Sequence, residues 1–206
     1  MPRQSRRRGS HDPDRDWRRQ LPTLTHASVS LRGLRKSDAA SLLNHLNRRS
    51  VLEFVQPSPK SVKGFEQFIH WTQSRRRQGW HLCFGIVPAG QTRPVGIIQV
   101  WPIEQDFSTA EWGFVVSEAY WGTGLFLQAA RLMFDFAFGA LGVHRLEARS
   151  VQTNARGNAV LRKLGARRDG ILREAFHRDG AFRPYIMWSI LAPEWSVSRK
   201  KLLSAS

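Results

Sequence analysis

One stretch of the chain constrains its fold more than any other. In residues 111–125 a strand-like run leads into Gly122 and Gly124, and from residue 126 to 138 apolar residues recur at helical spacing. The backbone N–H groups at a helix start have no intrahelical partner, and glycines let a phosphate approach them closely. The stretch predicts a strand, a phosphate-binding turn and a helix. With Glu111 on the strand, this order is typical of enzymes that transfer a group from a nucleotide-bearing donor.

The remaining patterns predict a mixed sheet. Strands are expected over residues 27–33, 81–87, 95–101, 110–116, 143–150, 170–176 and 185–191, and helices over 39–46, 62–78, 126–138 and 154–163. Ser37-Asp38 offers a cap for the first of these helices, and Ser61 is the candidate cap of the second. Because a helix lies between strands 110–116 and 143–150, these two should run parallel. The fold class predicted is α/β (α+β), with a mixed, mostly antiparallel central sheet and flanking helices.

Length and hydropathy indicate one domain. The chain has 206 residues, of which 41% are hydrophobic, enough for a single core. We expect a basic, disordered arm over residues 1–22, a domain over 23–196 and a basic tail over 197–206. The longest apolar stretch, 132–141, contains Asp135 and is too short to cross a bilayer, so a cytoplasmic protein without a membrane partner is predicted. The only cysteine, Cys83, lies in an apolar run, which favours an inert core thiol.

The charge of the chain is strongly positive. A formal net charge of +16 results from 32 Lys and Arg residues against 16 Asp and Glu residues. A field of this sign attracts phosphates, RNA or acidic protein surfaces, although a solvated charged arm would show the same pattern. The histidines are not paired at metal-ligand spacing, so no metal is expected. A dinucleotide-binding turn would need a third glycine where Leu127 stands.

Four segments carry a resemblance to a known family. They are Glu-Trp-Gly-Phe at 111–114, Tyr-Trp-Gly-Thr-Gly at 120–124, Gly-Val-His-Arg-Leu-Glu-Ala-Arg at 142–149, and Asn-Ala-Arg-Gly-Asn-Ala-Val-Leu-Arg-Lys-Leu-Gly at 154–165. In their order and spacing, residues 27–195 resemble the GNAT superfamily of N-acetyltransferases. Within it they look most like the RimJ/RimL-like branch, which acetylates the N-terminal amine of ribosomal proteins. The resemblance implies the GNAT acyl-CoA N-acyltransferase fold and acetyl-CoA as co-substrate.

The resemblance also implies a coenzyme site. Amides of the glycine turn would bind the diphosphate, main-chain groups of the preceding strand would pair with pantetheine, and an asparagine would bond the pantetheine arm. The implied coenzyme-binding residues are Phe114, Val116, Trp121, Gly122, Thr123, Gly124, Leu125, Phe126 and Asn154. The chain departs from the family pattern at Ala119, where Gln or Arg is usual, and at Phe126, where a small residue is usual.

An amine must lose a proton before it can attack a thioester. The resemblance assigns the base to Glu111, acting directly or through water. Glu147 on the adjoining strand is an alternative candidate for the base. Glu111 could also be a surface carboxylate that pairs with an arginine and has no catalytic role. The ribosomal branch often has a serine, thought to return a proton to the leaving thiolate, where this chain has Gly157. That role is therefore unassigned.

The sequence thus predicts an N-acetyltransferase that moves an acetyl group from acetyl-CoA to a primary amine by direct attack. The acceptor that the resemblance favours is a protein N-terminal α-amine, as on a ribosomal protein. The arginine-rich arm would hold the enzyme near rRNA or the ribosome. Two alternatives stay open: a small-molecule amine acetyltransferase, and a catalytically silent GNAT fold that binds RNA or protein. A monomer and a homodimer are both compatible with the sequence.

Overall fold

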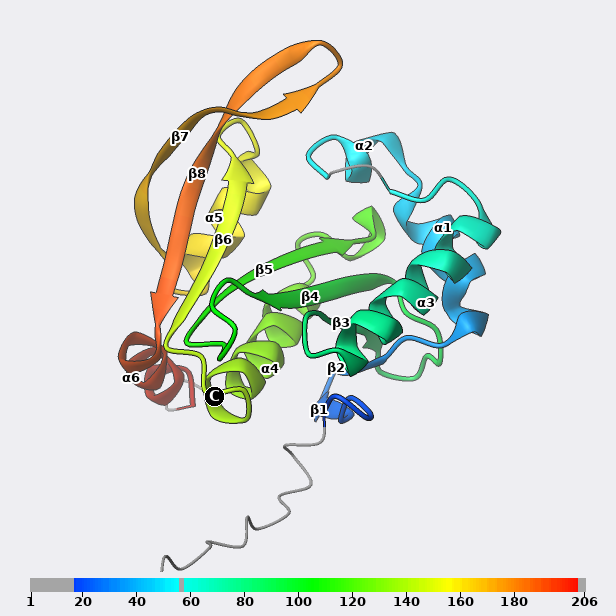
Figure 1. Cartoon of the computed structure of the whole chain (residues 1–206), viewed down its shortest axis with the longest axis horizontal. Helices are drawn as coiled ribbons and strands as arrows, with labels where there is room; N and C mark the ends of the chain where they lie inside the picture. Colours follow the sequence, from blue (N-terminus) through cyan, green and yellow to red (C-terminus); the bar gives the residue numbers. More distant parts are fainter. Residues whose placement is uncertain (1–16, 56–57, 204–206) are drawn as a thin grey trace, which may run out of the picture.

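The computed structural model describes residues 17–55 and 58–203 and is built around one eight-stranded sheet (Figure 1). The strands, in spatial order, are β1 (Leu24–His26), β2 (Val29–Gly33), β3 (Leu82–Pro88), β4 (Gly96–Pro102), β5 (Thr109–Val116), β6 (Arg145–Val151), β8 (Ala181–Leu191) and β7 (Arg167–Arg178). Every neighbouring pair is antiparallel except β5 and β6, which run parallel. The mixed, mostly antiparallel sheet is confirmed, and so is the parallel pair.

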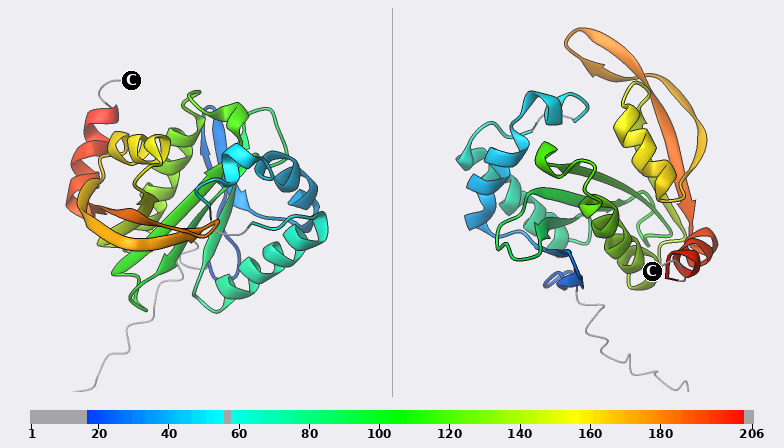
Figure 2. Two further views of the ribbon diagram at one scale, coloured as in Figure 1. Left: turned by 90° about the horizontal axis from the view of Figure 1, so that it is seen from above. Right: turned by 180° about the vertical axis from the view of Figure 1, so that it is seen from behind.

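Helices cover both faces of the sheet. They are α1 (Ala39–Leu46), α2 (Arg49–Leu52), α3 (Val62–Arg77), α4 (Leu125–Gly139), α5 (Ala155–Lys163) and α6 (Ala192–Leu203). Helices α1 and α3 lie on one face, where they share a core with Cys83 and Ile97 (Figure 1). Helices α4 and α5 lie on the other face, seen from behind in Figure 2, over the larger core. Within the described ranges, no helix has the length and hydropathy that crossing a bilayer requires.

Helix α3 begins and packs as the sequence pattern predicts. Ser61 Oγ accepts a hydrogen bond from the Gly64 N–H at 3.1 Å and so caps α3. Phe65 and Ile69, one helical turn apart, are buried on the sheet side of α3. Asp38, by contrast, makes no cap bond to α1. Its carboxylate is fully buried and accepts hydrogen bonds from both terminal nitrogens of Arg32, at 2.8 and 2.9 Å.

The ends of the domain differ from expectation. Trp17 and Leu21, which fall in the expected arm, are each 7% exposed and belong to the core. The Trp17 ring meets Phe107 edge-on at 5.5 Å, and Arg76 donates to the Trp17 carbonyl at 2.9 Å. The ordered chain therefore begins before residue 23, because an apolar tryptophan within the charged segment anchors it. Residues 197–203, expected as a tail, continue α6, while residues 1–16 of the arm lie outside the described residues.

The feature of the sheet that makes room for a site is the separation of β5 from β6. The two strands pair only where Thr109–Glu111 lie against Arg145–Glu147. Beyond Glu111 they diverge, and in Figure 1 the half-sheet of β6, β8 and β7 leans away from β5. A gap between two strands leaves main-chain N–H and C=O groups without a ladder partner. The binding groups described below come from the two sides of this gap.

Candidate active site

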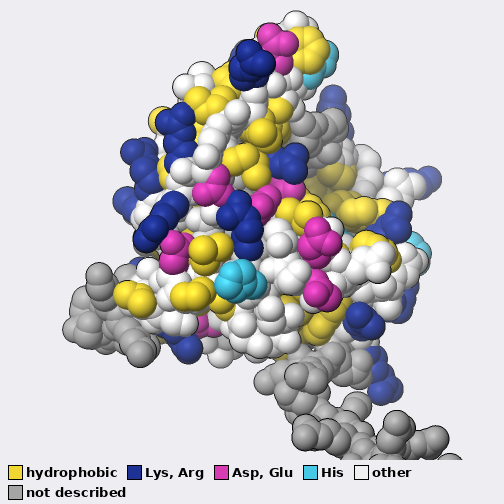
Figure 3. Space-filling model, turned by 60° about the vertical axis from the view of Figure 1, so that its left-hand side comes forward, with side chains coloured by type: hydrophobic (Ala, Val, Ile, Leu, Met, Phe, Trp, Pro, Cys, Tyr) yellow, Lys and Arg dark blue, Asp and Glu magenta, His cyan; other side chains and the backbone are white. Residues whose placement is uncertain are grey.

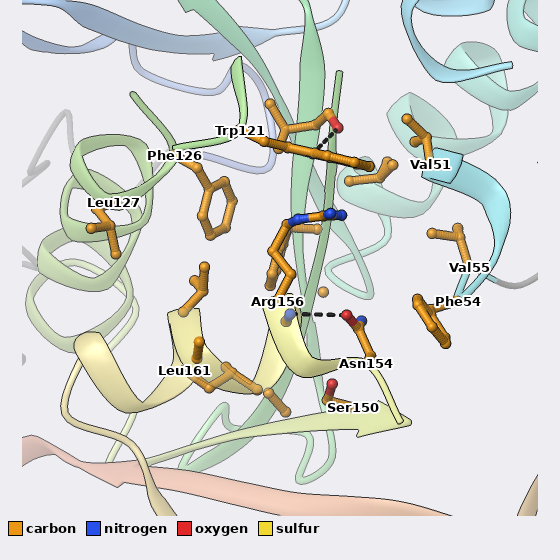
Figure 4. A pocket seen from close by; sticks show the side chains of 18 of the residues that line it. Val51, Phe54, Val55, Trp121, Phe126, Leu127, Ser150, Asn154, Arg156 and Leu161 are labelled. Atoms are coloured by element: carbon orange, nitrogen blue, oxygen red, sulfur yellow. Dashed lines mark hydrogen bonds between the residues drawn. The ribbon is translucent and has the colours of Figure 1, made fainter. Parts of the chain in front are cut away.

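A cavity of about 460 Å³ lies in the gap between β5 and β6 (Figure 4). The start of α4 and the first turns of α5 close it on one face of the sheet, and the segment around α2 borders it on the other. Its described lining residues include Val51, Phe54, Val55, Trp112–Val116, Tyr120–Gly122, Gly124, Phe126, Leu127, Ala148–Val151, Asn154, Arg156, Gly157 and Lys163. Of the coenzyme-binding residues expected from the sequence, the structure brings all to this cavity except Thr123 and Leu125.

The turn before α4 is an open cradle. Gly122 and Gly124 adopt φ angles of 78° and 83°, which side chains rarely tolerate, and no atom lies within 4 Å of the place where either would carry a Cβ. Thr123 supports the turn from behind: its hydroxyl donates to the Tyr120 carbonyl at 2.9 Å and accepts the Leu125 N–H at 3.3 Å. The N–H groups of Phe126 and Leu127 lie in the first turn of α4, where no intrahelical carbonyl is available, and the Gln128 N–H is the first to bond a carbonyl, that of Gly124 at 3.3 Å. The arrangement suits an anion.

The main chain of β5 offers a second set of binding groups. Ile103 N donates to Thr109 O and Ser117 N donates to Val95 O, so the odd-numbered residues of β5 bond to β4. By alternation, the N–H and C=O groups of Phe114 and Val116 point toward β6, into the gap. The Val116 carbonyl accepts a hydrogen bond from Trp121 Nε1 at 3.2 Å. Both residues expected to pair with pantetheine thus face the cavity with their main chains.

Phe126, the unusually large residue in the turn, does not fill the cavity. Its ring stacks on Phe114 with centroids 4.0 Å apart and lies parallel to Trp112 at 6.5 Å. These aromatic rings belong to the core under α4. Phe126 therefore forms part of the cavity wall, and the departure from the family pattern is accommodated by the aromatic residue on the neighbouring strand.

The charged side chains among the described lining residues are all basic. Arg149, Arg156 and Lys163 line the cavity, and the described lining residues include no carboxylate. Arg156 crosses the cavity from α5, and its guanidinium carbon lies 3.4 Å from the centroid of the Trp121 ring (Figure 4). A positively charged wall opposite a helix start fits a ligand with several phosphate groups. The sequence analysis missed Arg156; its only signal was a basic residue two positions after the Asn154 cap.

Asn154 and Gly157 form the edge of the cavity at the start of α5. Asn154 Oδ1 accepts the Gly157 N–H at 2.9 Å, which caps the helix and leaves the side-chain NH₂ group to donate elsewhere. A Cβ on residue 157 would lie 2.6 Å from Asn154 Nδ2 and 3.1 Å from Ser150 Oγ. Only glycine fits there without displacing Asn154. The departure at Gly157 therefore keeps the Asn154 side chain in its present position.

Glu111 lies beside the cavity and is not among the residues that line it. It is on the opposite side of β5 from Phe114, its side chain is 13% exposed, and Oε2 is 3.3 Å from Arg149 Nη2. Burial raises the pKa of the Glu111 carboxyl; Arg149 opposes this shift, and the adjacent Glu147 adds to it. A carboxyl with a raised pKa that contacts a cavity residue is a reasonable proton acceptor. The pairing with arginine exists as well, but the carboxylate is not on the surface.

Glu147, the alternative base, is held more tightly. Its Oε1 lies 2.6 Å from Arg145 Nε, and Arg145 also binds Asp169. On the face of the molecule drawn in Figure 3, acidic and basic side chains are interspersed. An acceptor for a proton needs a free lone pair directed at its substrate, and the close Arg145 partner occupies one oxygen of Glu147. Between the two carboxylates, Glu111 has the looser partner.

The only cysteine of the chain lies in the core, as its apolar sequence neighbours indicate. Cys83 is buried under α1 and α3, and burial raises the pKa of its thiol. In the described part of the chain, no group of His, Cys, Asp or Glu side chains could hold a metal ion.

Comparisons with known proteins bear on this site. A family model described as an acetyltransferase (GNAT) domain matches residues 28–167. The chain is 30% identical over 135 residues to the "Probable N-acetyltransferase YjcK" of Bacillus subtilis, which covers 65% of this chain and 75% of that protein. It is 28% identical over 178 residues to the spermidine N(1)-acetyltransferase of Escherichia coli, with coverage of 84% and 91%.

Two further comparisons concern proteins whose names refer to ribosomal proteins or to coenzyme A. Over 124 residues the chain is 21% identical to the ribosomal protein uS5-alanine N-acetyltransferase of Escherichia coli, covering 60% of this chain and 64% of that protein. The structure of Mycobacterium smegmatis RimJ in complex with CoA-disulfide matches with a TM-score of 0.75 at 24% identity, over 84% of this chain and 87% of that one.

Proposed function

Because the chain belongs to the acetyltransferase (GNAT) domain family and is an acetyl-CoA-dependent N-acetyltransferase, we propose that its acceptor is a protein N-terminal α-amine and that the coenzyme binds in the gap between β5 and β6. The observation that carries the second part is the cavity itself. It joins an open glycine turn at a helix start, unpaired main chain on β5, and a lining in which the charged residues that the structure describes are all basic.

Different residues along the cavity bind different parts of the coenzyme in this proposal. The amides after Gly122 and the Arg156 guanidinium bind the diphosphate in this proposal. The NH₂ group of Asn154 and the main chain of Phe114 and Val116 hold the extended arm of the coenzyme. When bound, acetyl-CoA supplies an activated acetyl thioester. The Phe114 N–H, fixed in the strand, is placed to donate to the oxyanion that forms on attack, an interaction that can contribute about 3 kcal/mol.

The acceptor approaches from the α2 face of the sheet in this proposal. Val51, Phe54 and Val55 border the cavity there, and Arg178 from β7 holds the α2 segment by donating to the Leu52 and Val55 carbonyls. Glu111 is on the same face of the sheet, so it takes the proton of the attacking amine directly or through water. In this proposal the amine attacks the thioester directly, without a covalent enzyme intermediate.

A protein N-terminus is favoured as acceptor by two observations. One relative acts on a ribosomal protein alanine, as its name states. An α-amine also has a lower pKa than a lysine, about 8 against about 10, so more of it is already neutral when it meets Glu111.

A small polyamine is the second candidate, because the spermidine acetyltransferase matches over more of this chain than the ribosomal enzyme does. The physical argument runs against it. A polycation would meet a chain of net charge +16 and a cavity with Arg149, Arg156 and Lys163 among its lining residues.

The test is an acceptor screen with acetyl-CoA. Peptides with a free N-terminus, the same peptides with a blocked N-terminus and a free lysine, and spermidine are compared at equal concentration, by release of coenzyme A thiol and by mass spectrometry. Acetylation at the free N-terminus, absent from the blocked partner, is the expected result. Turnover of spermidine or of lysine alone would overturn the acceptor assignment. Failure to release thiol with any amine would overturn the wider proposal.

A further inference from the structure

We propose that Ser150 is a catalytic residue whose hydroxyl donates a hydrogen bond to the coenzyme sulfur as it leaves. The inference rests on the proposed function, since it requires the coenzyme to lie in the gap between β5 and β6. It fills the role that Gly157 leaves vacant, with a side chain from a different element.

The position of Ser150 is the first argument. The register that pairs Glu111 with Glu147 would set Ser150 opposite Phe114 if the two strands stayed paired, but they have separated by this point. Ser150 instead lines the cavity from the β6 side. Figure 4 shows its hydroxyl directed into the cavity next to Asn154. A thioester that lies along the Phe114 main chain would therefore meet this hydroxyl from across the gap.

The hydrogen bonding of Ser150 is the second argument. The residue is 7% exposed, and its Oγ is buried without a partner in the described structure. The other buried serines in these ranges have partners: Ser117 Oγ lies 3.1 Å from His45 Nδ1, and Ser189 supports the Asp169 carboxylate. A buried hydroxyl without a partner is costly to the fold and therefore calls for a ligand that completes it.

The space in front of Ser150 is the third argument. A Cβ at residue 157 would lie 3.1 Å from Ser150 Oγ, so a side chain there would crowd the hydroxyl, and the glycine avoids this contact. The same glycine brings the Asn154 side-chain amide beside it. The hydroxyl and this amide are adjacent hydrogen-bond donors, and the described cavity lining holds no carboxylate that would compete for them. Such a pair of donors fits an atom that gains negative charge.

In the proposed acetyl transfer, Ser150 donates a hydrogen bond but does not give up its proton. The amine nitrogen forms a bond to the acetyl carbon, the carbon–sulfur bond breaks, and its electron pair stays on sulfur. The proton from the amine goes to Glu111 or water. A serine hydroxyl is a much weaker acid than a thiol, so Ser150 keeps its proton and stabilises the thiolate by a charge-assisted hydrogen bond. The thiolate is released or takes a proton from solvent.

The experiment compares Ser150→Ala, which removes the hydroxyl, with Ser150→Thr, which keeps it, and with Ser189→Ala as a matched buried control. For Ser150→Ala we expect kcat to fall about 10- to 100-fold, the value of one hydrogen bond to a charged group, with KM for acetyl-CoA changed less than about twofold. Ser150→Thr should recover most of the rate, and Ser189→Ala should keep it. The melting temperature of Ser150→Ala should not fall, because an unpaired buried hydroxyl is removed.

A second readout does not depend on turnover. Ultraviolet absorbance of the thiolate reports the pKa of coenzyme A bound to each variant, and this pKa should rise by about one to two units in Ser150→Ala relative to the unchanged protein. Normal kcat together with an unchanged thiol pKa in Ser150→Ala would overturn the role of Ser150 while the acetyltransferase proposal stands. If the unchanged protein neither binds coenzyme A nor releases it with any amine, the proposed function fails first.

Discussion

Replacing Arg156 with alanine is the sharpest test of where the coenzyme lies. The Arg156 guanidinium stacks on Trp121, with the guanidinium carbon 3.4 Å from the ring centroid. The tryptophan ring contacts one face of the guanidinium, and the N–H groups at the guanidinium edge can still donate hydrogen bonds to a ligand. An anion can therefore be bound without breaking the stack. The loss on mutation is then the whole of the charge-assisted hydrogen bonding, about 1.5–3 kcal/mol, which corresponds to roughly 10- to 150-fold weaker binding of acetyl-CoA.

The assay is calorimetric titration with two donors, acetyl-CoA and S-acetylpantetheine, which lacks the diphosphate. Arg156→Ala should weaken the binding of acetyl-CoA and leave the binding of S-acetylpantetheine unchanged. Arg156→Lys keeps the charge but loses the flat stack, so its affinity for acetyl-CoA should lie between those of the unchanged protein and Arg156→Ala. Arg162→Ala is the matched control, because Arg162 lies on the same helix, bonds the Asn158 carbonyl and does not line the cavity.

Two results would refute the reasoning about Arg156. An equal loss of affinity for S-acetylpantetheine would show that the residue acts on the arm or on the helix, and not on the diphosphate. An unchanged affinity for acetyl-CoA would show that the stack on Trp121 turns the guanidinium away from the ligand.

Three further predictions concern a base, a turn and a buried ion pair. Glu111→Gln should lower kcat about 100-fold and remove the fall in rate as pH drops through the raised pKa of this carboxyl; if Glu147→Gln does so instead, in the same pH profile, the base is Glu147. Gly124→Val should weaken acetyl-CoA binding in titrations, since the backbone at φ 83° strains any other residue and the open cradle is filled; unaltered affinity would mean that the turn is only structural. Burial raises the pKa of Asp38 but Arg32 and other donors outweigh it, so the net pKa is lowered and the stabilisation is present at neutral pH and lost as pH falls through the folded-state value. Asp38→Asn should therefore lower the free energy of unfolding by about 3 kcal/mol near pH 7, and by less in acid, as measured by urea denaturation; a constant difference at all pH values would contradict the ion-pair account.

The elements around the site could be predicted because their signals are local. The turn at Gly122 and Gly124 is visible as two glycines before an apolar helix, and the structure gives both glycines the positive φ angles that explain them. Asn154 was recognisable as a helix cap and is one. The parallel pairing of β5 with β6 followed from the intervening helix, since a crossover connection leaves few other geometries.

The residues that could not be predicted depend on two elements meeting. Arg156 is significant because α5 faces the glycine turn across the gap, and Ser150 because β6 leaves β5 before reaching it. Neither has a sequence pattern of its own. The same holds for Trp17, whose burial depends on Phe107, far along the chain. Local periodicity predicts which side of an element a residue occupies, but not which residue of another element it meets.

One structural event, the end of pairing between β5 and β6 after Glu111 and Glu147, links the separate features of the site. If the strands stayed paired, the Phe114 main chain would be bonded to β6, and no cavity would exist between the strands. Because they part, the β5 side supplies main-chain donors and the β6 side supplies a hydroxyl, at opposite walls of one gap. Glu111 is the last paired residue of β5, which fixes a carboxylate of raised pKa at the point where the gap opens. The candidate base, the oxyanion donor and the thiolate donor are thus positioned by the same fork in the sheet, and a change that closes the fork should abolish all three roles together.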